Sequence, residues 1–296
     1  MKNISQIQRK IVPYVFVAPF IISLFVFYLY PLISTVIMSF QNIVPGEVEF
    51  IGLDNYKRLN DEHFFIAIKN SFVYTILTIA VLIPIPLILA TVLNNKKCLG
   101  SRFFRSAFFI PSLISVVVAG TIIRLLFASP EGAFINSILG FFNIEAQKWL
   151  MAGRIHAMFL LVIIALWRWT GINIIYFLSG LQTIPNELYE AADIDGANTL
   201  QKFKVITLPL LKPIIIFVTT ISILGGFSMF EESYILWSGN SPNNIGLTMV
   251  GYVYRKGFQS GDLGMGSAVG LVLLLIIVVL SLGELSLWGF FKRGEK

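Results

Sequence analysis

Residues 190–209 read EAADIDGANTLQKFKVITLP. This polar, charged block lies between two long apolar runs, and it carries too many charges to cross a bilayer. Gly196 divides it into two stretches patterned as short helices, because glycine readily takes the left-handed conformation that ends a helix. We therefore expect a surface loop with a short helix at Leu188–Ile194, capped by Asn186, and a second at Leu200–Ile206.

The composition of the whole chain is that of a membrane protein. Of 296 residues, 56% are hydrophobic and only 13% are charged, and the mean hydropathy is +0.80. A helix needs about 20 apolar residues to cross the hydrocarbon core. Uncharged windows of that length occur at residues 11–46, 70–95 and 263–283, and windows with one or two charges at 106–128, 155–178 and 213–237. The sequence predicts an all-α membrane protein with six transmembrane helices.

No linker or low-complexity tract interrupts the chain, so residues 1–296 are expected to form one transmembrane domain. Pro84 and Pro86 predict a kink in the second crossing. Proline lacks an N–H and leaves a carbonyl of the preceding turn without its usual donor. Within a membrane such carbonyls need partners from neighbouring helices or polar side chains.

The basic residues favour an orientation with both termini in the cytoplasm. Thirteen of the 22 lysines and arginines then lie inside and seven outside, in agreement with the positive-inside rule. The contrast is strongest in the short second loop, where Lys96, Lys97, Arg102 and Arg105 occur without an acidic residue. Residues 190–209 would then face the cytoplasm of a multi-pass protein in the plasma or inner membrane.

The sequence lacks the residue patterns typical of metal binding and of ATP hydrolysis. Cys98 is the single cysteine, and His63 and His156 have no metal-ligand spacing, so we expect no metal site. No G-x-x-x-x-G-K-[ST] phosphate loop is present, so the chain is not expected to hydrolyse ATP, to bind a cofactor or to be an enzyme. The net charge of +6 is explained by membrane orientation, and nucleic acid is not an expected partner.

The spacing E-A-A-x-x-x-G, then nine residues, then I-x-L-P, resembles the cytoplasmic loop of the membrane subunits of binding-protein-dependent ABC importers. Residues 178–213, 102–111 and 230–242 are similar to the sugar-importing branch, of the maltose-transporter type. The resemblance implies the type I importer (MetI-like) permease fold and the transport of a sugar or oligosaccharide. It implies as partners a second homologous permease, two ATPase subunits that carry ATP and magnesium, and an extracytoplasmic sugar-binding protein.

In this family the loop transmits force from the ATPase dimer. The resemblance therefore assigns a coupling loop, residues 179–212, that swings the attached helices between inward-open and outward-open states. The residues matching the motif are Glu190, Ala191, Ala192, Asp195, Gly196, Ile206, Leu208 and Pro209.

A substrate site is expected where ionisable groups lie at membrane depth, because such groups face the bundle interior or a watery cavity. Glu231 and Glu232 follow a glycine pair, Gly225-Gly226, expected to loosen the helix. Carboxylates and aromatic rings suit sugar hydroxyls and C–H faces. The resemblance implies that the positions matching Arg168, Trp169 and Ile172 are near the sugar and that the helix before Glu231 helps to line the site. The candidates are Trp167, Arg168, Trp169, Ile172, Asn173, Phe227, Ser228, Phe230, Glu231 and Glu232. Alternatively, Arg168 pairs with one of the acids as a structural bridge.

Two other functions fit part of the sequence. An ion- or proton-coupled secondary transporter shares the hydrophobicity and the intramembrane charges, but is usually larger, with two related halves. An intramembrane enzyme needs a convergent nucleophile and base, and both histidines lie outside the expected cavity. The identity of the sugar is not determined by the sequence.

Overall fold

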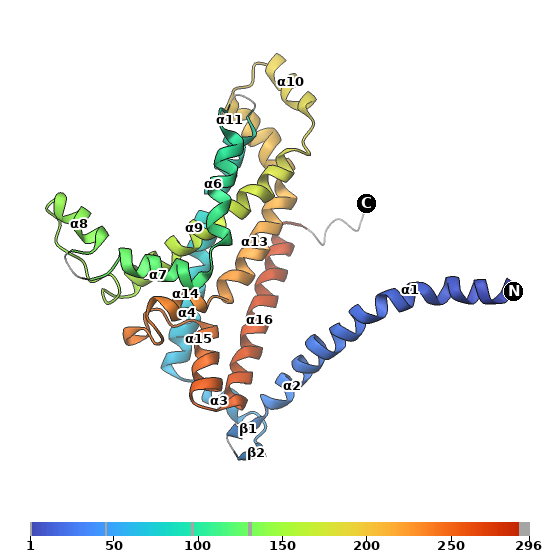
Figure 1. The fold of residues 1–296 in the computed structure, drawn as a ribbon, viewed down its shortest axis with the longest axis vertical. Helices are drawn as coiled ribbons and strands as arrows, with labels where there is room; N and C mark the ends of the chain where they lie inside the picture. Colours follow the sequence, from blue (N-terminus) through green and yellow to red (C-terminus); the bar gives the residue numbers. More distant parts are fainter. Residues whose placement is uncertain (1, 45, 96–97, 130–131, 290–296) are drawn as a thin grey trace. The chain divides into compact units, whose positions relative to one another are not determined.

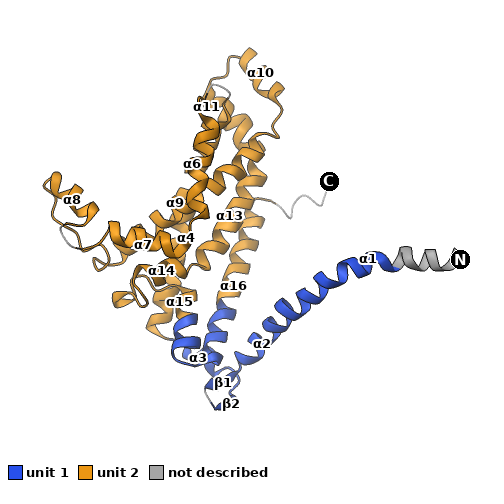
Figure 2. Ribbon diagram, in the orientation of Figure 1, with its two compact units in different colours: residues 1–60, 253–272 blue, residues 61–252, 273–296 orange. Residues whose placement is uncertain are grey.

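The computed structural model describes residues 2–44, 46–95, 98–129 and 132–289. These residues are mostly helical (Figure 1) and form two compact units: residues 1–60 with 253–272, and residues 61–252 with 273–296 (Figure 2). Lys96, Lys97 and both chain ends, on which the predicted orientation partly depends, lie outside the described residues.

The first unit begins with three successive helical segments, α1 (Lys2–Leu24), the π-helix η1 (Phe25–Leu29) and α2 (Tyr30–Met38). An antiparallel hairpin of β1 (Gln41–Val44) and β2 (Glu47–Phe50) follows, with Gln41 opposite Phe50. The unit continues with α3 (Asp54–Arg58), η4 (Arg255–Gln259) and the first part of α16 (Leu263–Leu287). The all-α prediction thus omitted a small hairpin, whose start lies within the window 11–46 expected to be one span.

The hairpin is held by a buried amide. Asn55 is fully buried, and its Nδ2 donates to the carbonyls of Ser39 and Gln41 at 3.0 and 2.8 Å. Gly264 at the start of α16 packs so closely that an added Cβ would lie 1.9 Å from the Gln41 carbonyl oxygen. Arg58 pairs with Asp262 at 2.7 Å. These contacts fix the chain where the first crossing ends.

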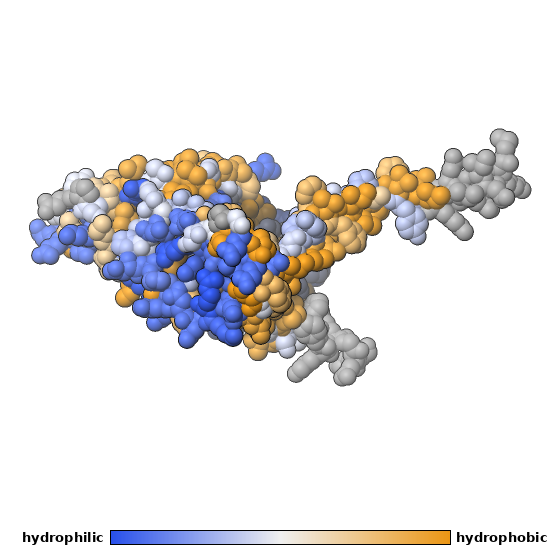
Figure 3. All heavy atoms as spheres, turned by 90° about the horizontal axis from the view of Figure 1, so that it is seen from below, coloured by the Kyte–Doolittle hydropathy of each residue, from blue (hydrophilic) through white to orange (hydrophobic). Residues whose placement is uncertain are grey.

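The arm formed by α1, η1 and α2 has an apolar surface that its own chain leaves uncovered. In the candidate span Ile11–Met38, the most apolar window is 0% buried. Tyr14, Phe16 and Phe20 are each at least 70% exposed, and the arm is covered with hydrophobic spheres in Figure 3. Lipid or another protein must cover this surface, because water is a poor solvent for so much apolar area.

The second unit contains the remaining helices. They are α4 (Glu62–Leu82), α5 (Pro84–Asn94), α6 (Ser101–Leu113), α7 (Val116–Leu126), α8 (Phe134–Phe141), α9 (Arg154–Leu181), α10 (Asn186–Ile194), α11 (Thr199–Lys202), η2 (Phe203–Thr207), α12 (Leu208–Leu210), α13 (Lys212–Phe227), α14 (Glu231–Leu236), η3 (Pro242–Asn244), most of α15 (Met249–Tyr254) and the end of α16.

In the described residues, four of the six expected crossings appear as apolar helical spans, the third corresponds to a bent pair of helices, and the fifth, 213–237, is interrupted after α13 at residues 228–230. The four spans are Ile11–Met38, Glu62–Asn94, Arg154–Leu181 and Leu263–Leu287, and the two bent pairs would bring the total up to six. The third expected crossing, 106–128, is not one straight helix, because α6 and α7 meet at 97°. Pro111 lies just before the break, and the Ser115 hydroxyl caps α7 by accepting from the Val117 N–H.

The kink between α4 and α5 confirms the expectation from Pro84 and Pro86. Pro86 has no N–H to offer the carbonyl of Leu82, four residues earlier. Asn173 of α9 supplies the missing donor, with its Nδ2 3.0 Å from the Leu82 oxygen. Both groups are buried. A polar side chain of one helix therefore satisfies the backbone of its neighbour, as the hydrocarbon interior requires.

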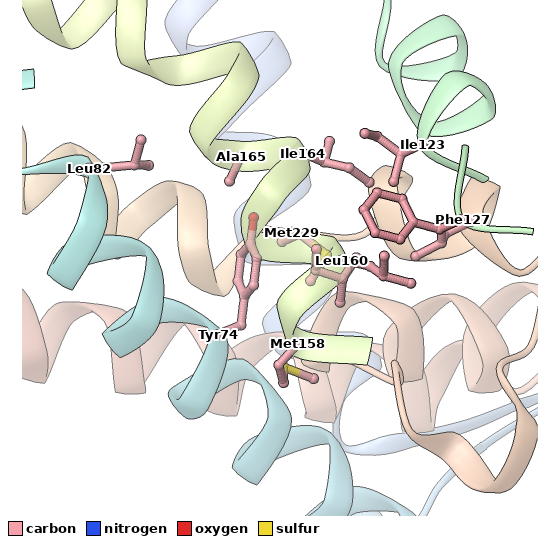
Figure 4. Close-up of a cluster of buried hydrophobic side chains, with 11 residues drawn as sticks. Tyr74, Leu82, Ile123, Phe127, Met158, Leu160, Ile164, Ala165 and Met229 are labelled. Atoms are coloured by element: carbon pink, nitrogen blue, oxygen red, sulfur yellow. The ribbon is translucent and has the colours of Figure 1, made fainter. Parts of the chain in front are cut away.

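The helices of the second unit pack through small residues and two apolar clusters. An added Cβ on Gly171 of α9 would lie 2.0 Å from the carbonyl oxygen of Phe108 in α6, so only glycine allows this approach. One cluster joins α4, α7 and α9 around Tyr74, Phe127 and Leu160 (Figure 4). The second joins α5, α9 and α13 and includes Leu93, Phe177, Leu181, Leu211 and Ile215.

We expect Gly171→Ala to destabilise the second unit by about 2 kcal/mol, because α6 must move away from α9. Gly283→Ala in α16 is the matched control, since nothing lies within 4 Å of its added Cβ and alanine favours helix. Thermal unfolding of the detergent-solubilised protein measures both. Equal midpoints for the two variants would contradict the close approach of α6 and α9.

Candidate functional site

A cavity of about 450 Å³ lies within the second unit. Its walls come from α4, α9 and α13, from the break between α13 and α14, and from Val250 of α15. Its volume is in the range of small-ligand sites in proteins. The lining residues are Tyr74, Thr78, Leu82, Ala165, Arg168, Trp169, Ile172, Asn173, Tyr176, Ile221, Ser222, Gly225, Gly226, Ser228, Met229, Phe230, Glu231, Glu232 and Val250.

One wall of the cavity is a continuous face of α9. Arg168, Ile172 and Tyr176 are four residues apart and so project from the same side of the helix. The guanidinium of Arg168 lies over the ring of Trp169, 5.5 Å from its centroid. Asn173 also lines the cavity, although its Nδ2 is engaged with the Leu82 carbonyl.

The two acidic residues, Glu231 and Glu232, also line the cavity. Arg168 Nη1 donates to Glu232 Oε1 at 3.1 Å, and the two side chains are only 14% and 12% exposed. The bridge between Arg168 and an acid, one of the two sequence alternatives, is therefore present. Arg168 can donate a further hydrogen bond, because its Nε is buried without a hydrogen-bond partner in the described part of the chain. Glu231 is exposed to the cavity.

The acids reach the cavity because α13 ends before them. The chain breaks at residues 228–230, and α14 starts at Glu231. The carbonyl of Met229 in the break accepts from the Thr248 hydroxyl at 2.7 Å, and the Ser233 hydroxyl of α14 donates to the Gly246 carbonyl at 2.6 Å. The Thr248 side chain of the loop 238–248 thus satisfies the broken backbone, and the Ser233 side chain of α14 holds α14 to the same loop.

The expected effect of the glycine pair was wrong. Gly225 and Gly226 lie inside α13, which stays helical through Phe227. An added Cβ on Gly226 would lie 2.4 Å from the Thr75 hydroxyl oxygen, so this glycine permits close packing of α13 on α4. The helix ends just after the pair, at Ser228.

Eight of the ten residues expected at the substrate site line the cavity, and two do not. Trp167 is absent from the lining. Phe227 is 1% exposed and packs edge-on against Phe72, with ring centroids 4.9 Å apart. The eight are Arg168, Trp169, Ile172, Asn173, Ser228, Phe230, Glu231 and Glu232.

Sequence reasoning missed the contribution of α4. Tyr74 lines the cavity but is only 4% exposed, and Figure 4 shows its hydroxyl pointing toward Ala165 of α9. Thr78 and Leu82 follow on the same face of α4. The four-residue spacing of Tyr74, Thr78 and Leu82 indicates a shared helix face and could have pointed to this wall of the cavity. It was missed because these residues lie in an apolar run without a charged residue.

The coupling loop forms a compact helical hairpin at one end of the second unit (Figure 1). α10 ends where Gly196 takes a φ of +75°, and the Ala197 N–H donates back to the Ala192 carbonyl at 2.8 Å. Asn198 then caps α11 in a reciprocal capping box with Gln201. The break at Gly196 is as expected, whereas the expected cap by Asn186 is wrong: Asn186 is already inside α10, which begins after Pro185 without a side-chain cap.

The two arms of this hairpin are fixed to each other and to the apolar cluster below. Lys202 pairs with Asp193, and the Tyr189 hydroxyl lies 2.9 Å from the Thr207 hydroxyl. Tyr189, Phe203 and Ile206 pack against the cluster that contains Leu211. Packing therefore connects α10 to the apolar cluster at the start of α13. The helix α13 meets the segment Thr199–Leu210 at 67°.

Most motif residues of the loop are accessible. Glu190, Ala191, Asp195, Gly196, Leu208 and Pro209 are exposed, and Ala192 and Ile206 are partly buried. The loop also presents apolar side chains that the sequence analysis did not single out. Ile194, Leu200 and Val205 are 88%, 61% and 74% exposed. Apolar side chains uncovered to this degree on a charged loop mark a contact surface.

No group of three or more histidine, cysteine, aspartate or glutamate residues in the described ranges could hold a metal ion. Cys98 is a free, partly buried thiol.

Comparison with known proteins identifies the family. Residues 82–287 match the family described as "Binding-protein-dependent transport system inner membrane component". The chain belongs to this family. It is the multi-pass inner-membrane permease component of an ABC importer and does not itself catalyse a reaction. The alternative of an ion- or proton-coupled secondary transporter is set aside.

Two curated relatives and one solved structure support this assignment. The arabinooligosaccharides transport system permease AraP of Bacillus subtilis (strain 168) is 56% identical over 285 residues, covering 96% of this chain and 91% of that protein. The permease MsmF of the multiple sugar-binding transport system of Streptococcus mutans is 34% identical and covers 88% of this chain and 90% of that protein. A chain from a bacterial ABC transporter that imports alginate has a TM-score of 0.85, with 100% of both chains covered and 24% identity, which confirms the fold.

We expect Arg168→Met to destabilise the chain by roughly 1–3 kcal/mol, since it leaves Glu232 nearly buried without its partner. Glu232→Gln in the same background should recover part of that loss. The coupling energy from this double-mutant cycle should be at least about 1 kcal/mol. Thermal unfolding in detergent measures it, and Arg102→Met, which changes an exposed arginine, is the control. Strictly additive effects would exclude an energetically important bridge.

Proposed function

We propose that this chain is the permease subunit of an importer of arabinooligosaccharides and that the 450 Å³ cavity is the sugar's passage through its half of the pathway. The main support is similarity to curated arabinooligosaccharide permeases, at 56% identity over 96% of the chain and 51% over 98%. The cavity fits such a ligand chemically. It offers the rings of Trp169, Tyr176 and Phe230 for stacking and the Ser222 and Ser228 hydroxyls for hydrogen bonds.

Arg168, Glu231 and Glu232 are proposed to contact the sugar in addition to the bridge between Arg168 and Glu232. The unpartnered Arg168 Nε supports this role, because a buried donor without a partner carries a free-energy cost that a ligand oxygen would relieve. Trp169, Ile172, Asn173, Ser228 and Phe230 complete the proposed site, whereas Trp167 and Phe227 are left out of it.

The proposed power source is a pair of ATPase subunits that bind ATP and magnesium and dock on the coupling loop, residues 179–212. The exposed Glu190 and the apolar Ile194, Leu200 and Val205 offer a mixed charged and apolar contact surface. The docked loop would face the cytoplasm, as would both termini. Residues 1–296 would work as one permease domain.

A second, homologous permease and an extracytoplasmic sugar-binding protein are the other proposed partners. The unburied arm of α1 and α2 supports a protein partner within the membrane, since its apolar residues lack contacts in their own unit. The family's dependence on a binding protein supports delivery of sugar from outside. The bilayer itself surrounds the assembly.

Uptake of radiolabelled arabinotriose by cells that express the complete transporter tests the substrate. Uptake should depend on this chain and should be outcompeted by unlabelled arabinotriose but not by arabinose polymers too long to be carried. If deletion of the chain leaves arabinotriose uptake unchanged but abolishes uptake of another sugar, the substrate assignment is refuted. The family assignment is not affected by that result.

We expect Gly196→Val to lower ATP-driven uptake at least about tenfold while the chain still inserts in the membrane, because valine at a φ of +75° strains the turn by about 1–2 kcal/mol and distorts the docking surface. Gly52→Val is the matched control: Gly52 has a φ of +60° and, like Gly196, nothing within 4 Å of its added Cβ.

Uptake and copurification of the ATPase subunits are measured for both variants. The coupling role predicts a defect for Gly196→Val alone. If both variants transport at the wild-type rate and retain the ATPases, the loop is not the coupling element.

A further inference from the structure

The cavity has an uncompensated negative charge. Among its described lining residues, Arg168, Glu231 and Glu232 are the charged ones. Arg168 and Glu232 form an ion pair at 3.1 Å, so their charges largely cancel. Glu231 has no basic side chain paired with it in the described part of the chain. The net charge that an entering molecule meets is therefore that of the Glu231 carboxylate.

This carboxylate is attached to a fixed element. Glu231 is the first residue of α14, which is held to loop 238–248 by the Ser233 to Gly246 hydrogen bond of 2.6 Å. On its other side α14 packs against α7, where an added Cβ on Gly120 would lie 2.9 Å from the Ile235 side chain. The charge therefore cannot move out of the cavity by displacement of its helix without breaking these contacts.

The surroundings of the Glu231 carboxylate strengthen its electrostatic effect on an entering molecule. Leu82, Ile172, Ile221 and Val250 provide apolar walls. A charge between low-dielectric walls acts over a longer distance than one in bulk water, because the field lines are focused in the watery space. The site is also a poor place for a second anion, since Glu232 at 3.1 Å already offsets the charge of Arg168, whose Nε, without a partner in the described residues, can donate equally well to an oxygen of a neutral sugar.

We propose that Glu231 is a charge filter: it makes the cavity accept neutral saccharides and reject those that carry a carboxylate, such as uronic or aldonic acids. This proposal rests on the proposed function, in which the cavity holds the sugar. A neutral sugar loses nothing from the charge and gains a strong acceptor for its hydroxyls. A carboxylate about 6 to 12 Å from Glu231 is disfavoured by between about a hundredfold and tenfold at the effective dielectric of protein surfaces.

The test compares arabinotriose with arabinotrionate, the acid obtained when the reducing end of the same trisaccharide is oxidised. Calorimetry measures the binding of each probe to the purified, detergent-solubilised transporter complex. The binding protein is left out, so that any preference between the two probes comes from the membrane site. The variants are Glu231→Gln, which removes the charge, and Glu231→Asp, which keeps it. Glu187→Gln, an exposed acid at the start of α10, makes the same change of net charge outside the cavity.

The wild type, Glu231→Asp and Glu187→Gln should all prefer arabinotriose over arabinotrionate by at least about tenfold. In Glu231→Gln this ratio should fall to less than about threefold, through a gain in affinity for the acid. The wild-type ratio should also shrink as salt is raised from about 20 mM to about 500 mM, because ions screen the carboxylate.

Three results would overturn the proposal: a ratio near one in the wild type, an unchanged ratio in Glu231→Gln, or equal changes in Glu231→Gln and Glu187→Gln. Loss of arabinotriose binding in Glu231→Gln without a gain for arabinotrionate would make Glu231 a ligand and not a filter. If the wild-type complex binds neither probe and cells import neither, the proposed function itself fails. If cells import arabinotriose but the preference for arabinotriose over arabinotrionate is unchanged in Glu231→Gln, the charge filter is refuted and the proposed function is not.

Discussion

The second unit depends on one constraint: a polar group that lies at membrane depth needs a partner from the protein or from the contents of the cavity, because hydrocarbon offers none. Asn173 supplies the donor that Pro86 cannot give to the Leu82 carbonyl, and this contact joins α9 to the kink between α4 and α5. Thr248 does the same for the Met229 carbonyl at the end of α13. At both of these breaks, a side chain from a neighbouring element bonds the backbone carbonyl that the interrupted helix leaves open.

The same constraint explains the Arg168 and Glu232 pair. An isolated charge at this depth would be costly, but two charges at 3.1 Å offset much of each other's desolvation penalty. The pair joins α9 to α14 through two residues that are 64 positions apart in the chain. A structural bridge and a sugar contact are therefore not competing roles: a bridge that is 14% and 12% exposed is stable in the resting protein and still has atoms that face the cavity.

The coupling loop and the cavity are connected by packing. Tyr189 and Phe203 rest on the cluster that contains Leu211 and Ile215, and Ile215 belongs to α13. Further along, α13 provides Ile221 and Gly225 to the cavity wall. A single helix, α13, therefore connects the loop with the cavity, which is consistent with the proposed coupling to a separate ATPase. The π-helix η2, between α11 and α12, lies within the segment that precedes the bend and adds a site where the backbone is less regular.

The sequence by itself determined which segments are apolar enough to cross a membrane, the break at Gly196, the family and which charged residues lie in apolar windows, because composition, spacing and glycine conformation are local properties. It did not determine that α6 and α7 meet at 97°, that Gly226 packs against Thr75 instead of breaking α13, or that Tyr74 faces the cavity while Phe227 is buried. Those outcomes depend on which helix lies opposite each residue. An apolar window reports only that a side chain avoids water, and it takes the neighbouring helices to decide whether that side chain faces a core, a cavity or lipid.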